Sequence, residues 1–391
     1  MKNKKTGKMF DYLAEDVIFQ ILSRLPAKSV LKFSCVCKLW NSIIKSPNFI
    51  STFSSNRHHP YILLSHIDCD VYKCSMRFDD KDFDEYVSLQ PLCKLPSKYE
   101  VIGSSNGLVC LNYYESSHIY KLIIWNPCIR KSLVIPEPSY STPFLSWSRS
   151  KLTGFGFDSR TNDYKLLLTD SINGVAIYSL NSNSWKKITT TGKYNKNYYR
   201  YIHSNPSAFI DGRFYWHILE RSVYMLVFDL RDEMFREISL PAAITRDPFK
   251  FKIKAFEESL IAFIGEYDIW VMKEYVTGEW MHLATVGNEW DENTNVLEFR
   301  DNGEVFVLFE KGQRLASYTI MNRRRKNLIV LSSKYEKNCG YRHVESLALL
   351  DKGNAISNHP PNYGRHRLSW LQGEVSKMVL TLRKRFKKLC T

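Results

Sequence analysis

Apolar positions in the first fifty residues recur at the spacing of amphipathic helices. One stripe ends at Pro26, because the residue before a proline is pushed out of the α region, and a second runs from Val30 to Ile44. This pattern predicts a helical unit over residues 9–50 and a linker over 51–60. Forty residues are too few to bury this much apolar surface among themselves. The sequence also shows no disulfide or similar cross-link that would stabilise so small a unit. The unit is therefore expected to need a partner. The first stripe comprises Leu13, Val17, Ile18, Ile21, Leu22 and Leu25.

Residues 61–350 change to short apolar segments separated by Gly, Asn, Asp, Ser and Pro. A unit made of a strand, a polar turn and a second strand recurs, with its apolar anchors about fifty residues apart. Further strand-like segments precede each unit, and pairs such as Asp211-Gly212 and Asn302-Gly303 favour tight hairpins. The units occupy residues 124–135, 177–188, 227–238, 272–283 and 318–329, of which the last is the weakest copy.

Recurrence at this period is typical of β-propeller blades. The Gly-Gly doublets of well-marked kelch repeats and the Gly-His and Trp-Asp pairs of WD40 repeats are missing. We therefore predict a mainly β chain with a small N-terminal α domain and a diverged, kelch-like propeller, whose number of blades stays open.

The last segment, residues 351–391, is a basic tail. Apolar positions between residues 366 and 390 keep helical spacing and are surrounded by Lys and Arg, which predicts a basic amphipathic helix. Such a helix fits a surface element docked on the domain, a nuclear-import patch or a calmodulin-type target.

The net charge of +15 is concentrated at the two ends of the chain. Residues 1–50 contribute +6 and residues 365–391 contribute +7, which leaves only +2 for the stretch between them. A nearly neutral central domain argues against a broad groove for a phosphate backbone, so nucleic acid is not the expected partner.

Local signatures of catalysis, cofactor binding and metal binding are absent from the sequence. The nine cysteines form no C-x-x-C pair, and Cys35 and Cys37 are expected to be small apolar side chains beside a helix. Gly154-Phe-Gly156 is not followed by a helix start, and the histidines lack metal-ligand spacing. We expect no catalytic residue, cofactor or metal. No apolar run approaches the ~18 residues of a membrane span and no secretory signal precedes the domain, so a cytoplasmic or nuclear protein is expected.

The N-terminal segment 13–49 resembles an F-box. One departure is Ala14, where the family usually has proline after the first leucine. The matching positions are Leu13, Glu15, Asp16, Val17, Ile21, Leu22, Leu25, Pro26, Lys28, Ser29, Leu31, Phe33, Val36, Cys37, Lys38, Trp40, Pro47 and Phe49.

The resemblance continues into the central region. Segments 101–111, 123–131, 154–167, 175–188 and 208–218 are similar to the F-box-associated domain of plant F-box proteins, including the S-locus F-box and kelch-like groups. The resemblance implies a three-helix F-box followed by a domain that captures a target protein. It also implies a non-catalytic substrate receptor of an SCF-type ubiquitin ligase, which binds a Skp-type adaptor and, through it, cullin and RING subunits.

Carried over onto this chain, the F-box motif places the adaptor contacts at Leu13, Pro26, Leu31, Val36 and Trp40. Trp40 and Val36 are expected to face outward. Leu22, Phe33 and Ile44 instead fit the role of holding the helices together.

Two insertions in the propeller have the composition of recognition loops, since rigid amphipathic rings contact partners at low entropic cost. One is residues 139–150 and the other is residues 189–205. The second of these insertions is rich in Tyr, and together with the basic tail it leaves open a nucleic-acid-binding propeller. A carbohydrate- or glycoprotein-binding receptor is a further alternative. The candidate target-binding residues are Trp147, Tyr194, Tyr198, Tyr199, Arg200 and Tyr201.

Overall fold

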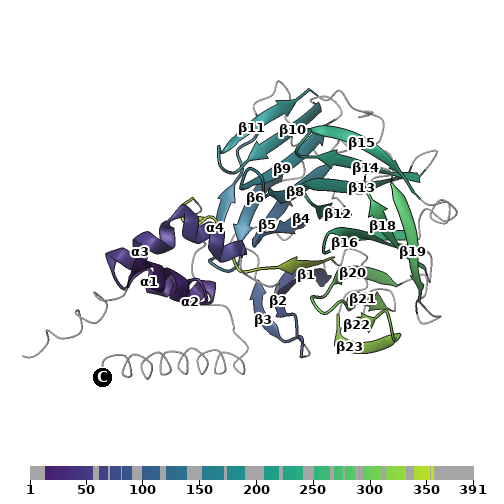
Figure 1. Ribbon diagram of the computed structural model, residues 1–391, viewed down its shortest axis with the longest axis horizontal. Coiled ribbons are helices and arrows are strands. Elements are labelled where there is room, and N and C mark those ends of the chain that lie inside the picture. The colour runs from purple at the N-terminus through teal and green to yellow at the C-terminus, as the bar shows by residue number, and fades with distance from the viewer. Residues whose placement is uncertain are drawn as a thin grey trace, which may run out of the picture.

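The computed structural model combines a helical unit with a six-sheet β-propeller (Figure 1). It describes residues 14–55, 61–68, 71–80, 82–89, 99–114, 120–138, 152–170, 174–189, 207–219, 223–240, 251–264, 268–275, 278–286, 290, 294–309, 314–331, 339–352 and 354–355. The predicted C-terminal helix over 366–390 lies outside these residues.

The described part of the helical unit has four helices: α1 (Glu15–Leu22), α2 (Ala27–Phe33), α3 (Lys38–Lys45) and α4 (Pro47–Ser55). The resemblance to an F-box implied three, and the apolar pattern in the sequence ended before Pro47. Pro47 instead begins α4, where its fixed φ suits the first helical turn and its missing N–H costs no helical hydrogen bond.

Five sheets of the propeller follow one another along the chain as antiparallel meanders. In the first of them, the short strand β25 (Asn354–Ala355) adds to the outer strand β7. The five sheets consist of β4 (Tyr99–Ser105), β5 (Leu108–Tyr114), β6 (Tyr120–Asn126) and β7 (Lys131–Val134); β8 (Thr153–Asp158), β9 (Asp163–Asp170), β10 (Gly174–Ser179) and β11 (Ser184–Ile188); β12 (Ala208–Ile210), β13 (Arg213–Leu219), β14 (Val223–Asp229) and β15 (Met234–Ser239); β16 (Phe251–Phe256), β17 (Ser259–Ile264), β18 (Asp268–Glu274) and β19 (Glu279–Thr285); and β20 (Asn295–Phe299), β21 (Val305–Phe309), β22 (Arg314–Thr319) and β23 (Arg324–Val330).

The sixth sheet closes the ring by joining the two ends of the propeller sequence. Strands β1 (Tyr61–Asp68), β2 (Val71–Phe78) and β3 (Glu85–Leu89) come from its start, and β24 (Cys339–His343) comes from its end. β24 pairs antiparallel with β1, with Tyr61 opposite His343 and Leu63 opposite Tyr341. The number of blades, which the sequence left open, is six over the described residues.

Each repeat found in the sequence forms the outer hairpin of one blade. Residues 124–135 span the β6–β7 hairpin, and the other units correspond to β10–β11, β14–β15, β18–β19 and β22–β23. The predicted tight turn at Asp211-Gly212 is also confirmed, since both residues have positive φ, as a type I′ hairpin requires.

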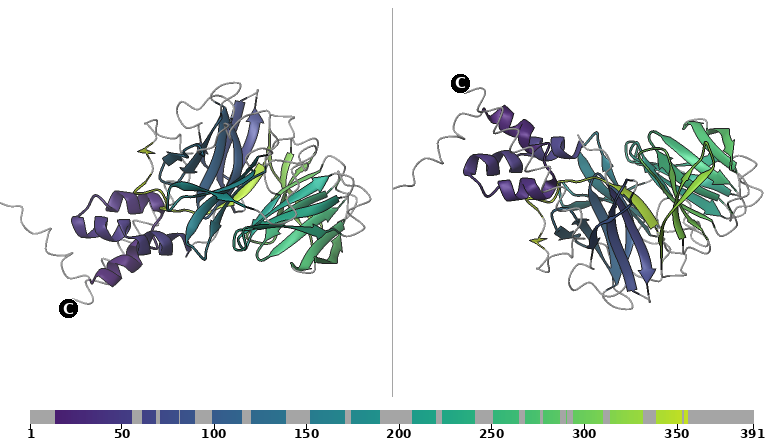
Figure 2. Two further views of the ribbon diagram at one scale, coloured as in Figure 1. Left: turned by 90° about the horizontal axis from the view of Figure 1, so that it is seen from above. Right: turned by 90° about the horizontal axis from the view of Figure 1, so that it is seen from below.

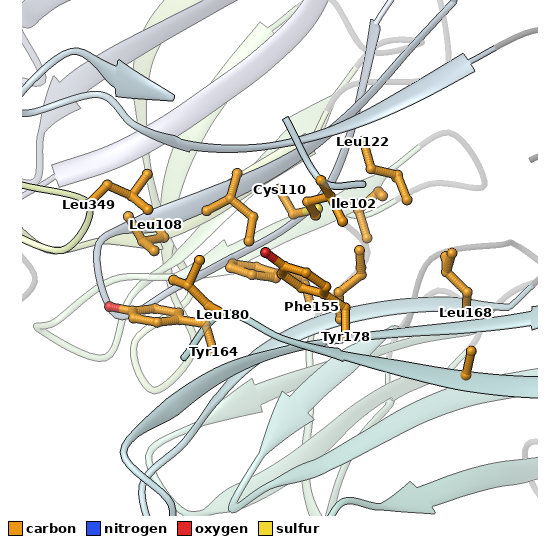
Figure 3. Packing of buried hydrophobic residues seen from close by; sticks show 14 residues of the cluster. Ile102, Leu108, Cys110, Leu122, Phe155, Tyr164, Leu168, Tyr178, Leu180 and Leu349 are labelled. Atoms are coloured by element: carbon orange, nitrogen blue, oxygen red, sulfur yellow. The ribbon is translucent and has the colours of Figure 1, made fainter. Parts of the chain in front are cut away.

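Neighbouring sheets pack face to face through apolar side chains. Between the β4–β7 and β8–β11 sheets, Leu108 and Leu122 of one sheet meet Phe155 and Tyr178 of the other (Figure 3). Leu349, which follows the closing strand β24, enters the same cluster. The segment that follows β24 is therefore part of the core between two blades.

The helical unit lies to one side of the propeller, next to the sheet of β4–β7 (Figures 1 and 2). Within the described residues, no helix is both long and apolar enough to cross a membrane.

A buried ion pair joins the closing sheet to the sheet before it. Arg300, only 4 % exposed, donates from Nε to Asp79 Oδ1 at 2.7 Å and from Nη2 to the Asp80 carbonyl at 2.8 Å. Its Nη1 contacts Ser317 Oγ at 3.0 Å, and its guanidinium lies 5.0 Å from the centre of the Phe306 ring. Arg300 thus links two blades through hydrogen bonds that water does not reach.

Replacing Arg300 by Met is expected to lower the free energy of unfolding by about 3–5 kcal/mol, because the Asp79 carboxylate then stays buried without its cation. Urea unfolding followed by tryptophan fluorescence measures the loss. The double variant Arg300→Met, Asp79→Asn is expected to recover part of it. A loss below about 1 kcal/mol in the single variant would contradict the role given to this pair.

Candidate protein-interaction surface

The helical unit has its own small core, which extends into the propeller. Aromatic contacts inside it include Phe19 against Phe49 and Phe33 against Trp40, with ring centres 5.0 and 5.3 Å apart. Two propeller residues, Ile129 and Leu347, belong to the same cluster, so helices and propeller share one apolar core. The helical members of the cluster are Ile18, Leu22, Leu25, Ala27, Val30, Trp40, Ile43, Ile44, Phe49 and Phe53.

The propeller reaches the helices through the segment that follows β24. In this closing segment, residues 344–352, the Glu345 carboxyl accepts the backbone N–H of Ala27 at 2.9 Å, and Ser346 Oγ lies 3.1 Å from Ser54 Oγ. Both contacts are buried. The closing segment therefore holds the N-terminus of α2 and the last turns of α4.

Asn126 fixes the closing segment to the β6–β7 turn. Its buried side-chain amide donates to the carbonyls of Ser346 and Ala348, both at 2.9 Å. Its Oδ1 accepts the backbone N–H groups of Cys128 at 3.0 Å and Ile129 at 3.3 Å. One side chain thus organises the backbone on both sides of the contact with the helices.

Gly107 allows the closing segment to approach the β4–β5 turn. A Cβ at this position would lie 2.2 Å from the Cβ of Ser346, and the φ of Gly107 is +80°. Because any side chain would both clash and adopt an unfavourable backbone conformation, the position requires glycine.

The helical unit also keeps large apolar side chains in solvent. Val36, in the turn between α2 and α3, is 51 % exposed, while Val17 is 42 % and Leu39 is 37 % exposed. These three side chains are the F-box candidates for contact with another macromolecule.

Comparison with known proteins identifies both parts of the chain. Residues 62–349 match the family of F-box associated beta propeller domains, and residues 10–52 match the F-box domain. The chain belongs to the F-box proteins with an F-box-associated β-propeller domain.

Three relatives of this F-box protein come from Arabidopsis thaliana. F-box protein At3g07870 is 27% identical over 361 residues, which cover 80% of this chain and 84% of the relative. Putative F-box protein At4g21240 is 27% identical, covering 71% of this chain and 68% of the relative. F-box protein At5g49610 is 25% identical, covering 73% of this chain and 81% of the relative. The chain is thus similar to plant F-box proteins over most of its length.

Within the F-box, the predicted contact residues differ in exposure. Val36 faces solvent as expected, whereas Pro26 and Leu31 are half-buried. Leu13 lies outside the described residues.

Trp40 does not face outward. Its side chain is 8 % exposed and packs edge-to-face against Phe33, so the expectation of an outward ring is wrong for the chain alone. The helical stripe that contains Trp40 is wide enough to form the core and part of the surface, and Trp40 belongs to the core side. Its role as an adaptor contact stays a prediction.

The two F-box cysteines are exposed in the α2–α3 turn rather than packed as apolar side chains.

Leu22 and Ile44 are fully buried, in keeping with their predicted role between the helices. Across the described residues, no group of His, Cys, Asp or Glu has the arrangement of a metal site.

Burial dominates the chemistry of the propeller thiols. It raises the pKa of Cys74 to about 12 and raises that of Cys110 as well. These thiols stay protonated at neutral pH and act as core side chains rather than nucleophiles.

The predicted target-binding residues Trp147, Tyr194, Tyr198, Tyr199, Arg200 and Tyr201 lie outside the described residues. The described strand β8 shows which face of the propeller its first residue occupies. β8 ends next to β4, where the Phe157 N–H donates to Ser105 Oγ at 3.0 Å, and β4 ends at the turn that contacts Ser346. Thr153, at the start of β8, therefore marks the opposite face, remote from the closing segment.

Replacing Asn126 by Asp is expected to destabilise the joint between F-box and propeller by about 3–5 kcal/mol, because a carboxylate then faces two carbonyl oxygens with no proton to donate. Urea unfolding measures the change. Asn322→Asp is the matched control, because Asn322 is exposed in the turn between β22 and β23, and it should change stability by less than about 0.5 kcal/mol. Equal effects of the two variants would contradict the role of Asn126.

Proposed function

We propose that this F-box protein is the substrate-recognition subunit of an SCF-type ubiquitin ligase. Its F-box would bind a Skp-type adaptor that connects it to cullin and RING subunits, and its propeller would bind the target protein. The chain contributes proximity, and the chemistry of ubiquitin transfer resides in the other subunits.

The exposed apolar surface of the F-box is the observation that carries this proposal. Val17, Val36 and Leu39 remain in solvent although the same unit already buries a core of its own and docks on the propeller. A partner that covers them gains the free energy of apolar burial, which amounts to roughly 25 cal/mol per Å². We assign the adaptor to these side chains, together with half-buried Pro26 at the start of α2 and Leu31 within it.

The target is proposed to bind the propeller face remote from the F-box. The inner strands β8 and β12 begin there, after the two insertions of residues 139–150 and 189–205. Loops presented by a rigid scaffold are the usual site of recognition, and this placement keeps target and adaptor on separate surfaces.

Val36→Asp is expected to weaken adaptor binding at least about tenfold, because an apolar contact is replaced by a charge that must be desolvated. Isothermal titration calorimetry with a purified Skp-type adaptor measures the affinity. Val330→Asp is the matched control, since Val330 is 75 % exposed on β23 of the propeller, and it should leave binding unchanged. Surface variants are preferable to Trp40→Ala, which removes a buried ring and disrupts the F-box itself.

Unchanged affinity in Val36→Asp would remove Val36 from the interface. If the wild-type chain bound none of several Skp-type adaptors, the proposed function would be wrong.

The Val36→Asp variant also distinguishes captured target proteins from captured ligase subunits. Affinity capture from plant cells under proteasome inhibition is expected to retain target proteins on both the wild-type chain and Val36→Asp, and to retain adaptor and cullin only on the wild type. A genuine target should also have a shorter half-life when the wild-type chain is expressed than when Val36→Asp is expressed. Proteins whose abundance responds equally to both chains would not be targets of a ligase built on this F-box.

A further inference from the structure

Helix α2 lacks a cap from its own sequence. Its N-cap residue is Pro26, whose side chain makes no capping hydrogen bond. The backbone N–H of Ala27 is instead bonded to Glu345, 318 positions along the chain, at 2.9 Å. An acceptor with negative character at this end of a helix also interacts favourably with the helix dipole.

Glu345 is held firmly in this position. It is 3 % exposed, and its second carboxyl oxygen accepts the Tyr61 hydroxyl at 3.3 Å. The next two residues also join the F-box, through the Ser346–Ser54 contact and the buried side chain of Leu347. The cap therefore comes from a fixed part of the propeller rather than from a surface side chain.

The other end of α2 leads directly to the exposed F-box surface. The helix has seven residues, and the following turn carries Val36, whose N–H donates to the Phe33 carbonyl at 3.0 Å. A change in the position of α2 must therefore move Val36.

Glu345 also lies only two residues after the strand that closes the propeller. β24 ends at His343, which pairs with Tyr61 of β1, and Tyr61 is the residue whose hydroxyl bonds Glu345. Closure of the ring and capping of α2 thus involve the same few residues.

We propose that Glu345 is a positioning residue for adaptor binding: the closing segment holds α2, and with it Val36, in the arrangement that the adaptor recognises. The F-box of this chain is then not autonomous, because its binding-competent form requires a closed propeller. This inference rests on the proposed function.

The test compares adaptor affinity with local and global stability in the full-length chain. Glu345→Ala removes the acceptor for the Ala27 N–H, and we expect it to weaken binding of a purified Skp-type adaptor roughly tenfold. Glu345→Gln keeps an acceptor oxygen at the same place, and we expect its affinity to stay within about threefold of the wild type. Glu279→Ala is the control, because that carboxyl lies 3.5 Å from Lys273 within the β16–β19 sheet, and it should leave affinity unchanged.

Hydrogen exchange supplies a readout that needs no adaptor. Glu345→Ala should speed amide exchange in residues 27–36 at least about tenfold, while exchange in β8–β19 stays as in the wild type.

Each result decides the inference. Equal adaptor affinity and equal exchange in Glu345→Ala and wild type would overturn it. Weaker binding accompanied by faster exchange throughout the propeller would also overturn it, since Glu345 would then be a general stability residue. Failure of the wild-type chain to bind any adaptor would refute the proposed function, whereas the exchange measurement would still show whether Glu345 holds α2.

Discussion

The pairing of β24 with β1 is the contact on which the rest of the structure depends. Without it the ring would leave two unpaired strand edges, which are open to pairing with other chains. It also positions the elements on both sides of the closing sheet. On one side Arg300 bonds Asp79, and on the other the closing segment runs from β24 to the F-box. A single antiparallel pairing between the two ends of the propeller sequence therefore organises the propeller and the joint.

The contact between F-box and propeller accounts for part of the apolar surface that the F-box has in excess of its own core. Its sequence holds more apolar surface than forty residues bury, which indicated an external partner. Part of that surface is covered by the chain itself, through Ile129 and Leu347. The large apolar side chains that stay exposed on the F-box are Val17, Val36 and Leu39.

The sequence predicts those parts of the structure that local chemistry determines. The outer hairpins, such as residues 177–188, follow from apolar alternation and turn residues within a dozen positions, and the F-box helices follow from their apolar period. The number of blades does not, because the closing sheet combines β1–β3 with β24 from the far end of the chain. Nor does the direction of Trp40, since a wide apolar stripe has two faces and only packing selects one. The cap on α2 lacked any local signal, as its donor and acceptor are 318 positions apart.

That separation also has a consequence for synthesis of the chain. At ribosomal rates of about 5–20 residues per second, roughly 16 to 64 s pass between the addition of Ala27 and that of Glu345. Throughout this interval the nascent F-box has an uncapped α2, and the surface that Leu347 later covers is open to water. Folding from the N-terminus onward cannot complete this domain, because the nascent F-box keeps apolar surface in water until Glu345 and Leu347 have been added.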